Sequence, residues 1–143
     1  MKQYLIDTNA LISFVTDRNA AQQESVARLF EQAAKARVTV LCPQNVLVEF
    51  AYVMDKVYRQ PKPLVRQMMT DFIALPGVTV VNDVDFAEVL DLWPEPIADL
   101  GDALVAAAAR GAKRVAVVTF DKDFIRAIKG LRIAVWEGGR EDL

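Results

Sequence analysis

The sequence contains no histidine, and this absence excludes several kinds of enzyme. Serine and cysteine hydrolases with a catalytic triad need a histidine as general base, and some ribonucleases use a histidine acid–base pair. Zinc and haem sites with histidine ligands are excluded for the same reason. Any chemistry of this chain must therefore come from carboxylates, lysine or arginine, hydroxyl groups or a metal ion held by oxygen ligands.

Cysteine and long apolar segments are also scarce. Cys42 is the single cysteine, so the chain can form neither an internal disulfide nor a thiolate zinc site. We expect Cys42 to be a buried apolar residue, because no histidine is present to activate its thiol. Residues 1–7 resemble neither a signal peptide nor a targeting helix, and no apolar run approaches the length of a membrane span. We therefore expect a cytoplasmic protein.

The residues that are present describe one folded domain, which we assign to residues 1–143. Hydrophobic residues make up 53% of the chain and charged residues 25%, with only six glycines and six prolines. A chain of this length and composition buries a substantial core and is not disordered. The net charge of −2 argues against broad electrostatic coating of nucleic acid, but it is compatible with local basic patches.

Short apolar segments alternate along the chain with longer segments of helical periodicity. The predicted strands span 4–6, 38–41, 78–81, 115–120 and 132–136. The predicted helices begin after residues 7–9 and span 22–37, 43–59, 64–75, about 85–93, 99–110 and 122–128. Because the strands are apolar on both faces and are followed by helices, we predict a three-layer α/β/α domain with a central parallel sheet of about five strands.

Acidic residues stand where these predicted strands end. Asp7 directly follows the first strand, and Asp121 follows the fourth, with Asp123 two residues later. Asp99 and Asp102 lie one turn apart at the start of an alanine-rich helix. In an open parallel sheet, the functional crevice lies beyond the carboxyl ends of the strands, where the strand order reverses. We therefore expect these acids to converge.

Glu49 is a further acid, inside the helix that follows the second strand. It lies on the flank of the apolar stripe, so we expect it to be partly buried. Each acid also has a purely structural explanation. Asp7, Asp99 and Asp121 are suitable helix caps, and Asp102 suits the second half of a capping box. Glu49 would in that case pair with a lysine or arginine.

A cluster of carboxylates without histidine indicates a divalent metal site. Carboxylates that lie close together raise one another's pKa unless a cation neutralises them. Clusters of oxygen ligands select Mg²⁺ or Mn²⁺, with water completing the coordination. Such ions generate hydroxide and stabilise the charge of a phosphodiester under in-line attack. The pattern therefore favours metal-dependent hydrolysis of phosphate bonds.

Four segments, in this order, resemble the motifs of the PIN domain family, and in particular the VapC-type toxins of type II toxin–antitoxin pairs. They are YLIDTNAL at 4–11, CPQNVLVEF at 42–50, DALVAAAA at 102–109 and VTFDKDF at 118–124. The resemblance extends over almost the whole chain. It implies a metal-dependent endoribonuclease in which a metal-activated water attacks the phosphorus and leaves a 5′-phosphate and a 3′-hydroxyl.

The resemblance also implies the residues of the site. Four acids would hold Mg²⁺ or Mn²⁺, two more are additional candidates, and three polar residues would orient ligands, water or phosphate. The four acids are Asp7, Glu49, Asp102 and Asp121; the additional acids are Asp99 and Asp123; the polar residues are Thr8, Asn9 and Thr119.

Partners follow from the same resemblance. We expect a VapB-like antitoxin, a homodimer and a structured RNA substrate such as tRNA or ribosomal RNA. Lys122 and Arg126 are the preferred RNA contacts, because they begin at the predicted site. We expect Tyr52, Tyr58 and the two tryptophans to lie in the core or on a dimer surface rather than to stack on bases.

Two other functions compete with this hypothesis. A catalytically silent PIN-like module that binds RNA or protein would have the same fold. A phosphotransfer domain would use a similar sheet, but a haloacid-dehalogenase-like phosphatase needs a second aspartate where this chain has Asn9. A response-regulator receiver needs an acidic pair after the first strand, and Asp7-Thr8 does not supply one.

Overall fold

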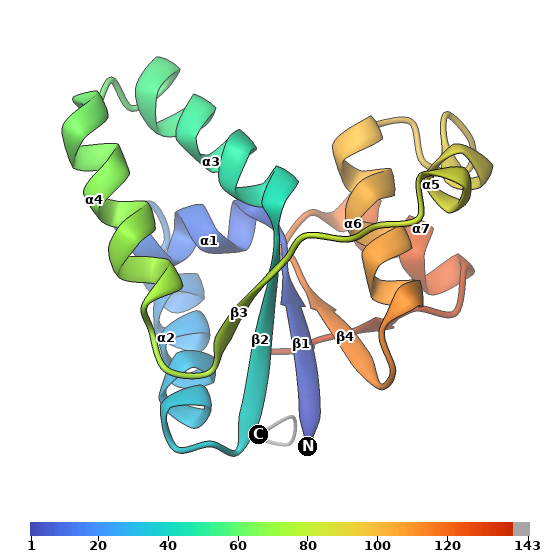
Figure 1. The fold of residues 1–143 in the computed structure, drawn as a ribbon, viewed down its shortest axis with the longest axis horizontal. Helices are drawn as coiled ribbons and strands as arrows, with labels where there is room; N and C mark the ends of the chain where they lie inside the picture. The colour runs from blue at the N-terminus through green and yellow to red at the C-terminus, as the bar shows by residue number, and fades with distance from the viewer. Residues whose placement is uncertain (139–143) are drawn as a thin grey trace.

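The computed structural model describes residues 1–138 and contains one five-stranded parallel sheet with the strand order β3-β2-β1-β4-β5 (Figure 1). This confirms the predicted α/β class and the central parallel sheet. The order reverses between β1 and β4, because the chain builds outward first in one direction from β1 and then in the other. The strands are β1 (Lys2–Ile6), β2 (Val38–Pro43), β3 (Val78–Val81), β4 (Val115–Val118) and β5 (Ala134–Val135).

The central strands are apolar on both faces, as the sequence predicts. Leu5 pairs with Leu41 on one side and with Val117 on the other, and Leu5 and Val117 are fully buried. Cys42 is also buried, and burial raises the pKa of its thiol to about 12, so the prediction of an apolar structural cysteine is confirmed. A parallel sheet needs this apolar character because helices cover both of its faces.

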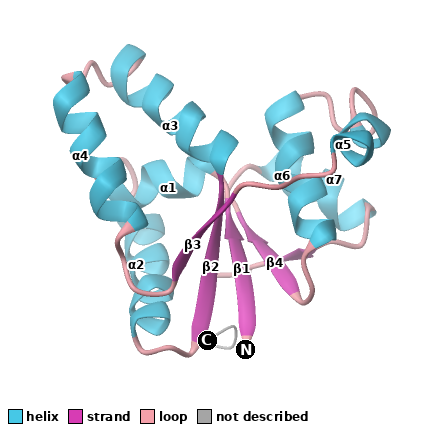
Figure 2. Ribbon diagram, viewed as in Figure 1, coloured by secondary structure: helices cyan, strands magenta, loops and turns pink. Residues whose placement is uncertain are grey.

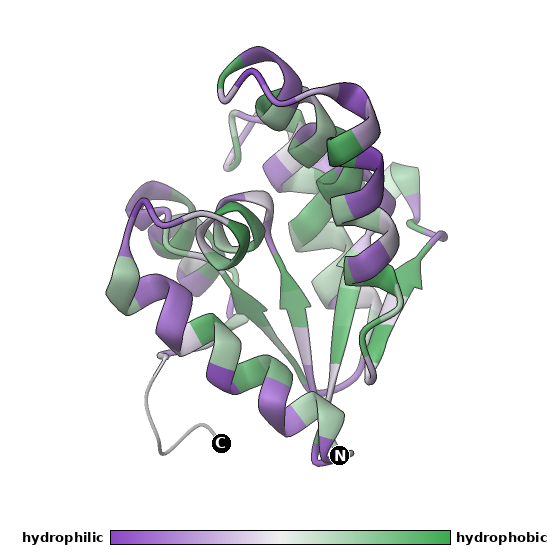
Figure 3. Ribbon diagram, turned by 90° about the vertical axis from the view of Figure 1, so that its left-hand side faces the viewer, coloured by the Kyte–Doolittle hydropathy of each residue, from purple (hydrophilic) through white to green (hydrophobic). Residues whose placement is uncertain are grey.

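Helices lie on both sides of the sheet, with α1 to α4 on one side and α5 to α7 on the other (Figure 2). They pack with apolar stripes inward, and Figure 3 shows strands that are hydrophobic along most of their length between helices of mixed character. No helix within residues 1–138 is long and apolar enough to cross a membrane. The helices are α1 (Thr8–Val15), α2 (Ala20–Ala34), α3 (Gln44–Lys56), α4 (Lys62–Ile73), α5 (Phe86–Leu92), α6 (Leu100–Gly111) and α7 (Lys122–Gly130).

The small side chains of α6 allow it to lie close to the sheet. Ala106 to Ala109 are all buried, and α6 packs on β4 and on α5. Alanine combines the highest helix propensity with the smallest side chain other than glycine, so this run favours both the helix and its close approach. The first turn of α6 is thereby held at the carboxyl edge of the sheet.

Two predicted strands are shorter in the structure than in the sequence analysis. The fourth ends at Val118 rather than at residue 120, where the Thr119 hydroxyl donates to Asp7 Oδ2 and accepts from the Asp121 backbone N–H, and the chain turns toward α7. The fifth contains only Ala134 and Val135, since Arg132 has a left-handed backbone with φ of 63°. In both cases a local backbone feature shortens the strand, and the pattern of apolar residues in the sequence does not indicate such a feature.

Gly77 joins α4 to β3 in a position that only glycine fits. Its φ is +81°, and a Cβ placed on it would lie 2.8 Å from both Cβ and the carbonyl oxygen of Ala33. We expect Gly77→Ala to lower the free energy of unfolding by at least about 1 to 2 kcal/mol, from backbone strain and this collision. Urea denaturation measures the difference.

Gly130→Ala at the end of α7 is the matched control. A Cβ there meets no atom within 4 Å, so this substitution should be neutral or should stabilise the protein by about 0.5 to 1 kcal/mol. Equal destabilisation by both substitutions would contradict the close approach of Gly77 to α2.

Candidate active site

The site lies where the sheet's strand order reverses. Asp7 immediately follows β1, and Asp121 lies three residues after the end of β4, the strand beside β1. In open parallel sheets this is the place where helices on opposite faces diverge and leave a crevice. The sequence prediction that these two strand-end acids lie near each other therefore agrees with the topology.

Asp7 is the most deeply buried acid of the site, with 5% of its surface exposed. Its Oδ1 accepts a hydrogen bond from the Thr8 backbone N–H at 2.7 Å, which caps α1. Its Oδ2 accepts from the Thr119 hydroxyl at 2.9 Å. Burial raises the pKa of Asp7 to about 6; these hydrogen bonds lower it, and the nearby charges of Glu49 and Asp121 raise it further.

Thr119 and Asn9 join the ends of β1 and β4. The Thr119 hydroxyl, which donates to Asp7, also accepts from the Asp121 backbone N–H at 3.2 Å. The Asn9 side-chain oxygen accepts from the Phe120 backbone N–H at 3.3 Å. Asp121 in turn caps α7, its Oδ1 accepting from the N–H groups of residues 123 and 124. The predicted polar residues thus fix the relative positions of two acids.

Glu49 reaches the same region from α3. Its Oε2 accepts a hydrogen bond from the Thr8 hydroxyl at 3.0 Å, so the third predicted polar residue connects α1 with α3. Partial burial raises the pKa of Glu49, and the charge of Asp99 raises it further, against the lowering effect of hydrogen bonds from Thr8 and Asn45. No ion pair to Glu49 is found within residues 1–138. The structural alternative, pairing with lysine or arginine, does not occur there.

Gly101 lets the first turn of α6 approach Glu49. A Cβ on Gly101 would collide with Glu49 Oε1 and would lie 3.1 Å from Asp99 Oδ1. The Asn45 side chain donates to the Gly101 carbonyl at 3.3 Å and holds α3 against α6. Gly101 and Asn45 are not among the site residues predicted from the sequence. The sequence does contain one indication for Gly101. Because glycine weakens helices, a glycine in the first turn of an otherwise alanine-rich helix indicates a close contact at that position.

Asp102 is the acid whose pKa is raised by the charges of the largest number of neighbouring acids. Burial raises its pKa to about 7, and the charges of four other acids add to this effect. The Asp102 backbone N–H donates to Asp99 Oδ1 at 2.9 Å, so Asp99 caps α6. No hydrogen bond from a backbone N–H to the Asp102 carboxylate is found among the described residues, so the second half of a capping box is not formed there. The four acids whose charges raise the pKa of Asp102 are Asp7, Asp99, Asp121 and Glu49.

The two additional acids differ in position. Asp99 lies close enough to raise the pKa of both Glu49 and Asp102. Asp123 instead forms an exposed ion pair with Arg126 at 3.3 Å and is not among the charges that act on Asp102. Lys122 is exposed at the first position of α7 and lines a hollow next to Thr119.

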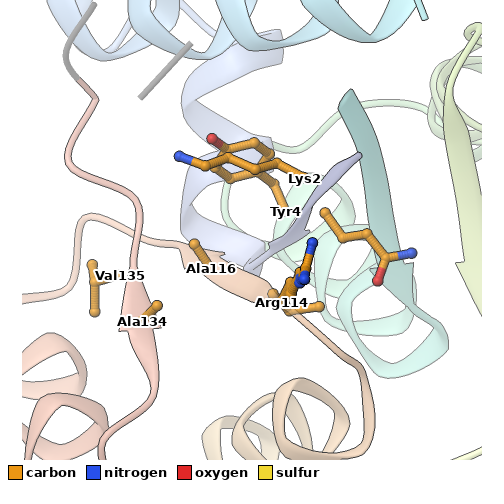
Figure 4. Close-up of a pocket in the computed structure, with 8 residues that line it drawn as sticks. Lys2, Tyr4, Arg114, Ala116, Ala134 and Val135 are labelled. Carbon is orange, nitrogen blue, oxygen red and sulfur yellow. The ribbon is translucent and has the colours of Figure 1, made fainter. Parts of the chain in front are cut away.

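A different cavity, of about 450 Å³, lies at the amino ends of β1 and β4, away from these acids. Its lining side chains come from β1, β4, β5 and the residue before β4 (Figure 4). They include Lys2 and Arg114 but no acid. This cavity therefore does not suit a divalent cation, and the acid cluster is the candidate active site.

The donor set of the cluster fits Mg²⁺ or Mn²⁺ with water among its ligands. All donors are carboxylate oxygens, and burial and mutual repulsion raise the pKa of Asp7, Glu49 and Asp102, effects that a cation reverses. Among the residues that the structure describes, no group of three or more acids is placed so that it could hold a metal ion directly. A cation at this cluster would therefore be held by one or two carboxylates and by several waters, which is the coordination that Mg²⁺ commonly takes.

Comparison with known proteins identifies one family, and the similar solved structures include one from Rickettsia felis and one from Pyrobaculum aerophilum. The model of the PIN domain family matches residues 4–130. A chain in the crystal structure of VapBC2 from Rickettsia felis bound to a DNA fragment from their promoter has a TM-score of 0.67 and 16% identity, with 94% of this chain and 97% of that chain covered. PAE2754 from Pyrobaculum aerophilum has a TM-score of 0.62 and 21% identity, with 90% and 88% covered. No curated protein sequence matches.

The raised pKa of Asp7 predicts a pH-dependent loss of stability when divalent cations are removed. Folding raises this pKa from 3.8 to about 6, so the folded protein binds the proton more tightly than the unfolded chain does. Keeping Asp7 ionised in the folded protein therefore lowers the free energy of unfolding. This cost is absent below pH 3.8 and complete above about 6, where it amounts to about 3 kcal/mol. The free energy of unfolding in EDTA should therefore fall more between pH 4 and pH 7 for wild type than for Asp7→Asn.

Urea denaturation across this pH range measures the effect. Asparagine also caps helices well, so Asp7→Asn keeps the start of α1. Asp123→Asn, at an exposed ion pair, should follow the wild-type pH profile. Parallel pH profiles for wild type and Asp7→Asn would contradict the raised pKa of Asp7.

Proposed function

We propose that this chain, which belongs to the PIN domain family, is a metal-dependent endoribonuclease. The observation that carries this proposal is the acid cluster at the point where the strand order reverses. Asp7 and Asp102 have raised pKa values there, and no lysine or arginine forms an ion pair with either within residues 1–138. Carboxylates without a cationic partner are a costly arrangement that a bound divalent cation stabilises.

Four acids would surround the ion, namely Asp7, Glu49, Asp102 and Asp121, with Asp99 beside them, and those that do not bind it directly would bind its waters. When bound, the ion would supply a nucleophilic water and stabilise negative charge on the phosphodiester. The chain's own residues orient the ligands. The Thr119 hydroxyl donates a hydrogen bond to Asp7 Oδ2, and the Thr8 hydroxyl donates one to Glu49 Oε2. These hydrogen bonds restrict the orientation of each carboxylate and thus the lone pairs that it can offer to a cation.

Asp102 determines the protonation state of the site. With a pKa of about 7, it carries a proton for part of the time in the absence of a cation at neutral pH. A divalent cation must displace this proton, so its affinity should rise as the pH increases through 7. The reaction needs no 2′-hydroxyl nucleophile, and its products would be a 5′-phosphate and a 3′-hydroxyl.

The cellular role that we propose is that of a VapC-type toxin in the cytoplasm, with residues 1–143 as a single domain. The fold likeness to a chain of the VapBC2 crystal structure supports this role. A VapB-like antitoxin would bind near the acids, and the chain would form a homodimer. Exposed apolar side chains offer contact surface on the helix that carries Glu49, where Val48 is 69% and Tyr52 is 65% exposed.

A structured RNA, such as tRNA or ribosomal RNA, is the substrate that we propose. The purified protein should cleave it with Mg²⁺ or Mn²⁺, and EDTA should stop cleavage. Asp7→Asn, Glu49→Gln and Asp102→Asn should each lower the rate by at least about 100-fold, because loss of a ligand exceeds the effect of losing an outer-shell partner. End-labelled RNA with product-end analysis measures both the rate and the chemistry.

Asp123→Asn is the control for these variants, since Asp123 is exposed and paired with Arg126 outside the cluster. Cleavage that survives EDTA, or all three substitutions, would refute the mechanism. A wild-type protein that binds RNA without cutting it in either metal would instead identify a catalytically silent binding module.

Gly101→Ala tests the approach of α6 to Glu49. The added Cβ would displace the Glu49 carboxylate, which lies at the end of a flexible side chain, so the fold should survive while the ligand moves. We expect the cleavage rate to fall by about 10- to 100-fold with little change in thermal unfolding. Gly111→Ala, in the same helix, adds a Cβ that meets no atom within 4 Å and should leave the rate unchanged. Equal rates for the two variants would contradict this placement of Glu49.

A further inference from the structure

A second hollow, of about 300 Å³, adjoins the acid cluster and contains side chains that the proposed chemistry does not use. We call it the tryptophan pocket. Thr119 connects the two sites, because its hydroxyl donates to Asp7 while the residue also lines the pocket. Its lining includes Thr119, Phe120, Lys122, Lys129 and Trp136.

Trp136 is the first sign that the pocket takes a ligand. Only 4% of its surface is exposed, and its indole Nε1 has no hydrogen-bond partner within residues 1–138. It is the one buried side-chain nitrogen or oxygen in that part of the chain without a partner. Buried donors are nearly always paired, since an unpaired one loses its hydration without compensation. Trp136 also lines the pocket, so an acceptor atom of a ligand bound there is the candidate partner for this donor.

The pocket also combines aromatic and cationic groups. Phe120 and Trp136 meet edge to face, with ring centroids 6.1 Å apart, and form an apolar wall. Lys122 and Lys129 are exposed on α7 at the same hollow. Lys129 lies 3.7 Å from Glu137, an exposed ion pair of the weak kind that a phosphate can displace. An aromatic surface beside ammonium groups is a typical arrangement for a nucleotide in a single strand.

We propose that the tryptophan pocket binds one nucleotide of the RNA strand, next to the phosphate held at the acid cluster. Lys122 and Lys129 contact its phosphate, and an acceptor on its base or ribose takes the Trp136 N–H against the Phe120 ring. The inference rests on the proposed function for the identity of the polymer. It adds a specificity element that lies on the β4–β5 side of the site.

The test measures binding without cleavage. In a Glu49→Gln background, Trp93→Phe leaves Trp136 as the only tryptophan. A short single-stranded oligoribonucleotide should change Trp136 emission on saturation, and nucleoside 5′-monophosphates should do so at higher concentration. Inorganic phosphate should not reproduce the change. An equal response to inorganic phosphate would overturn the nucleotide assignment, as would an absent response to saturating RNA.

Variants locate the contact. Lys129→Ala, and Trp136→Phe in the same Glu49→Gln background, should each raise the Kd for labelled oligoribonucleotide by about 10-fold, read by fluorescence anisotropy. Lys35→Ala is the control, because Lys35 is an exposed lysine at the end of α2, before β2 and remote from the carboxyl edge. Lys129 is exposed, so its replacement tests the pocket even where Trp136→Phe perturbs the core.

The two proposals can fail separately. If wild type does not cut RNA with metal but Trp136 responds to the oligoribonucleotide, the nuclease proposal fails and the pocket stands. If wild type cuts RNA while Lys129→Ala and Trp136→Phe bind it as tightly as Lys35→Ala does, the pocket fails and the nuclease proposal stands.

Discussion

Three aspartates bind backbone N–H groups at the starts of three helices, and the same geometry brings them to one acid cluster. Asp7, Asp99 and Asp121 each use Oδ1 for this hydrogen bond. The free N–H groups and the dipole of a helix start stabilise a carboxylate. This stabilisation opposes the mutual repulsion that contributes to the raised pKa of Asp102. These aspartates therefore cap helices and belong to the acid cluster at the same time, so the two explanations do not compete.

Assembly of the site depends on contacts between segments far apart in the sequence. Thr119 bonds to Asp7 across 112 positions, and Thr8 bonds to Glu49 across 41. The contact of Asn45 with Gly101 spans 56. Each contact joins a different pair of elements around β1, so the acids converge only when the sheet and the helices on both faces are in place. A substitution at any of these contacts can alter the site without touching a carboxylate.

The sequence predicts the positions of the strands, and the acids that follow them can be named, because both are local features. Apolar runs locate β1 and β4, and the topology of parallel sheets brings the residues after them together. It does not separate Asp99 from Asp123, because each lies within three residues of a stronger candidate. The separation comes from helix geometry: Asp99 caps α6 and faces Glu49, whereas Asp123 lies inside α7, where Arg126 one turn later pairs with it. Gly101 and Trp136 depend on packing between elements, for which a single sequence has no periodic signal.

The electrostatics of the site connect the proposed cation binding with the proposed RNA binding. Without a cation, the cluster repels a phosphodiester, and partial protonation of Asp102 only reduces that repulsion. The lysines of α7 are Lys122, at its first position, and Lys129, and both line the tryptophan pocket. A divalent cation would reverse the sign of the electrostatic potential at the acid cluster, and these lysines would stay in place. The chain's net charge of −2 therefore does not argue against the proposed RNA substrate, because part of its acidic excess is concentrated where a cation would neutralise it.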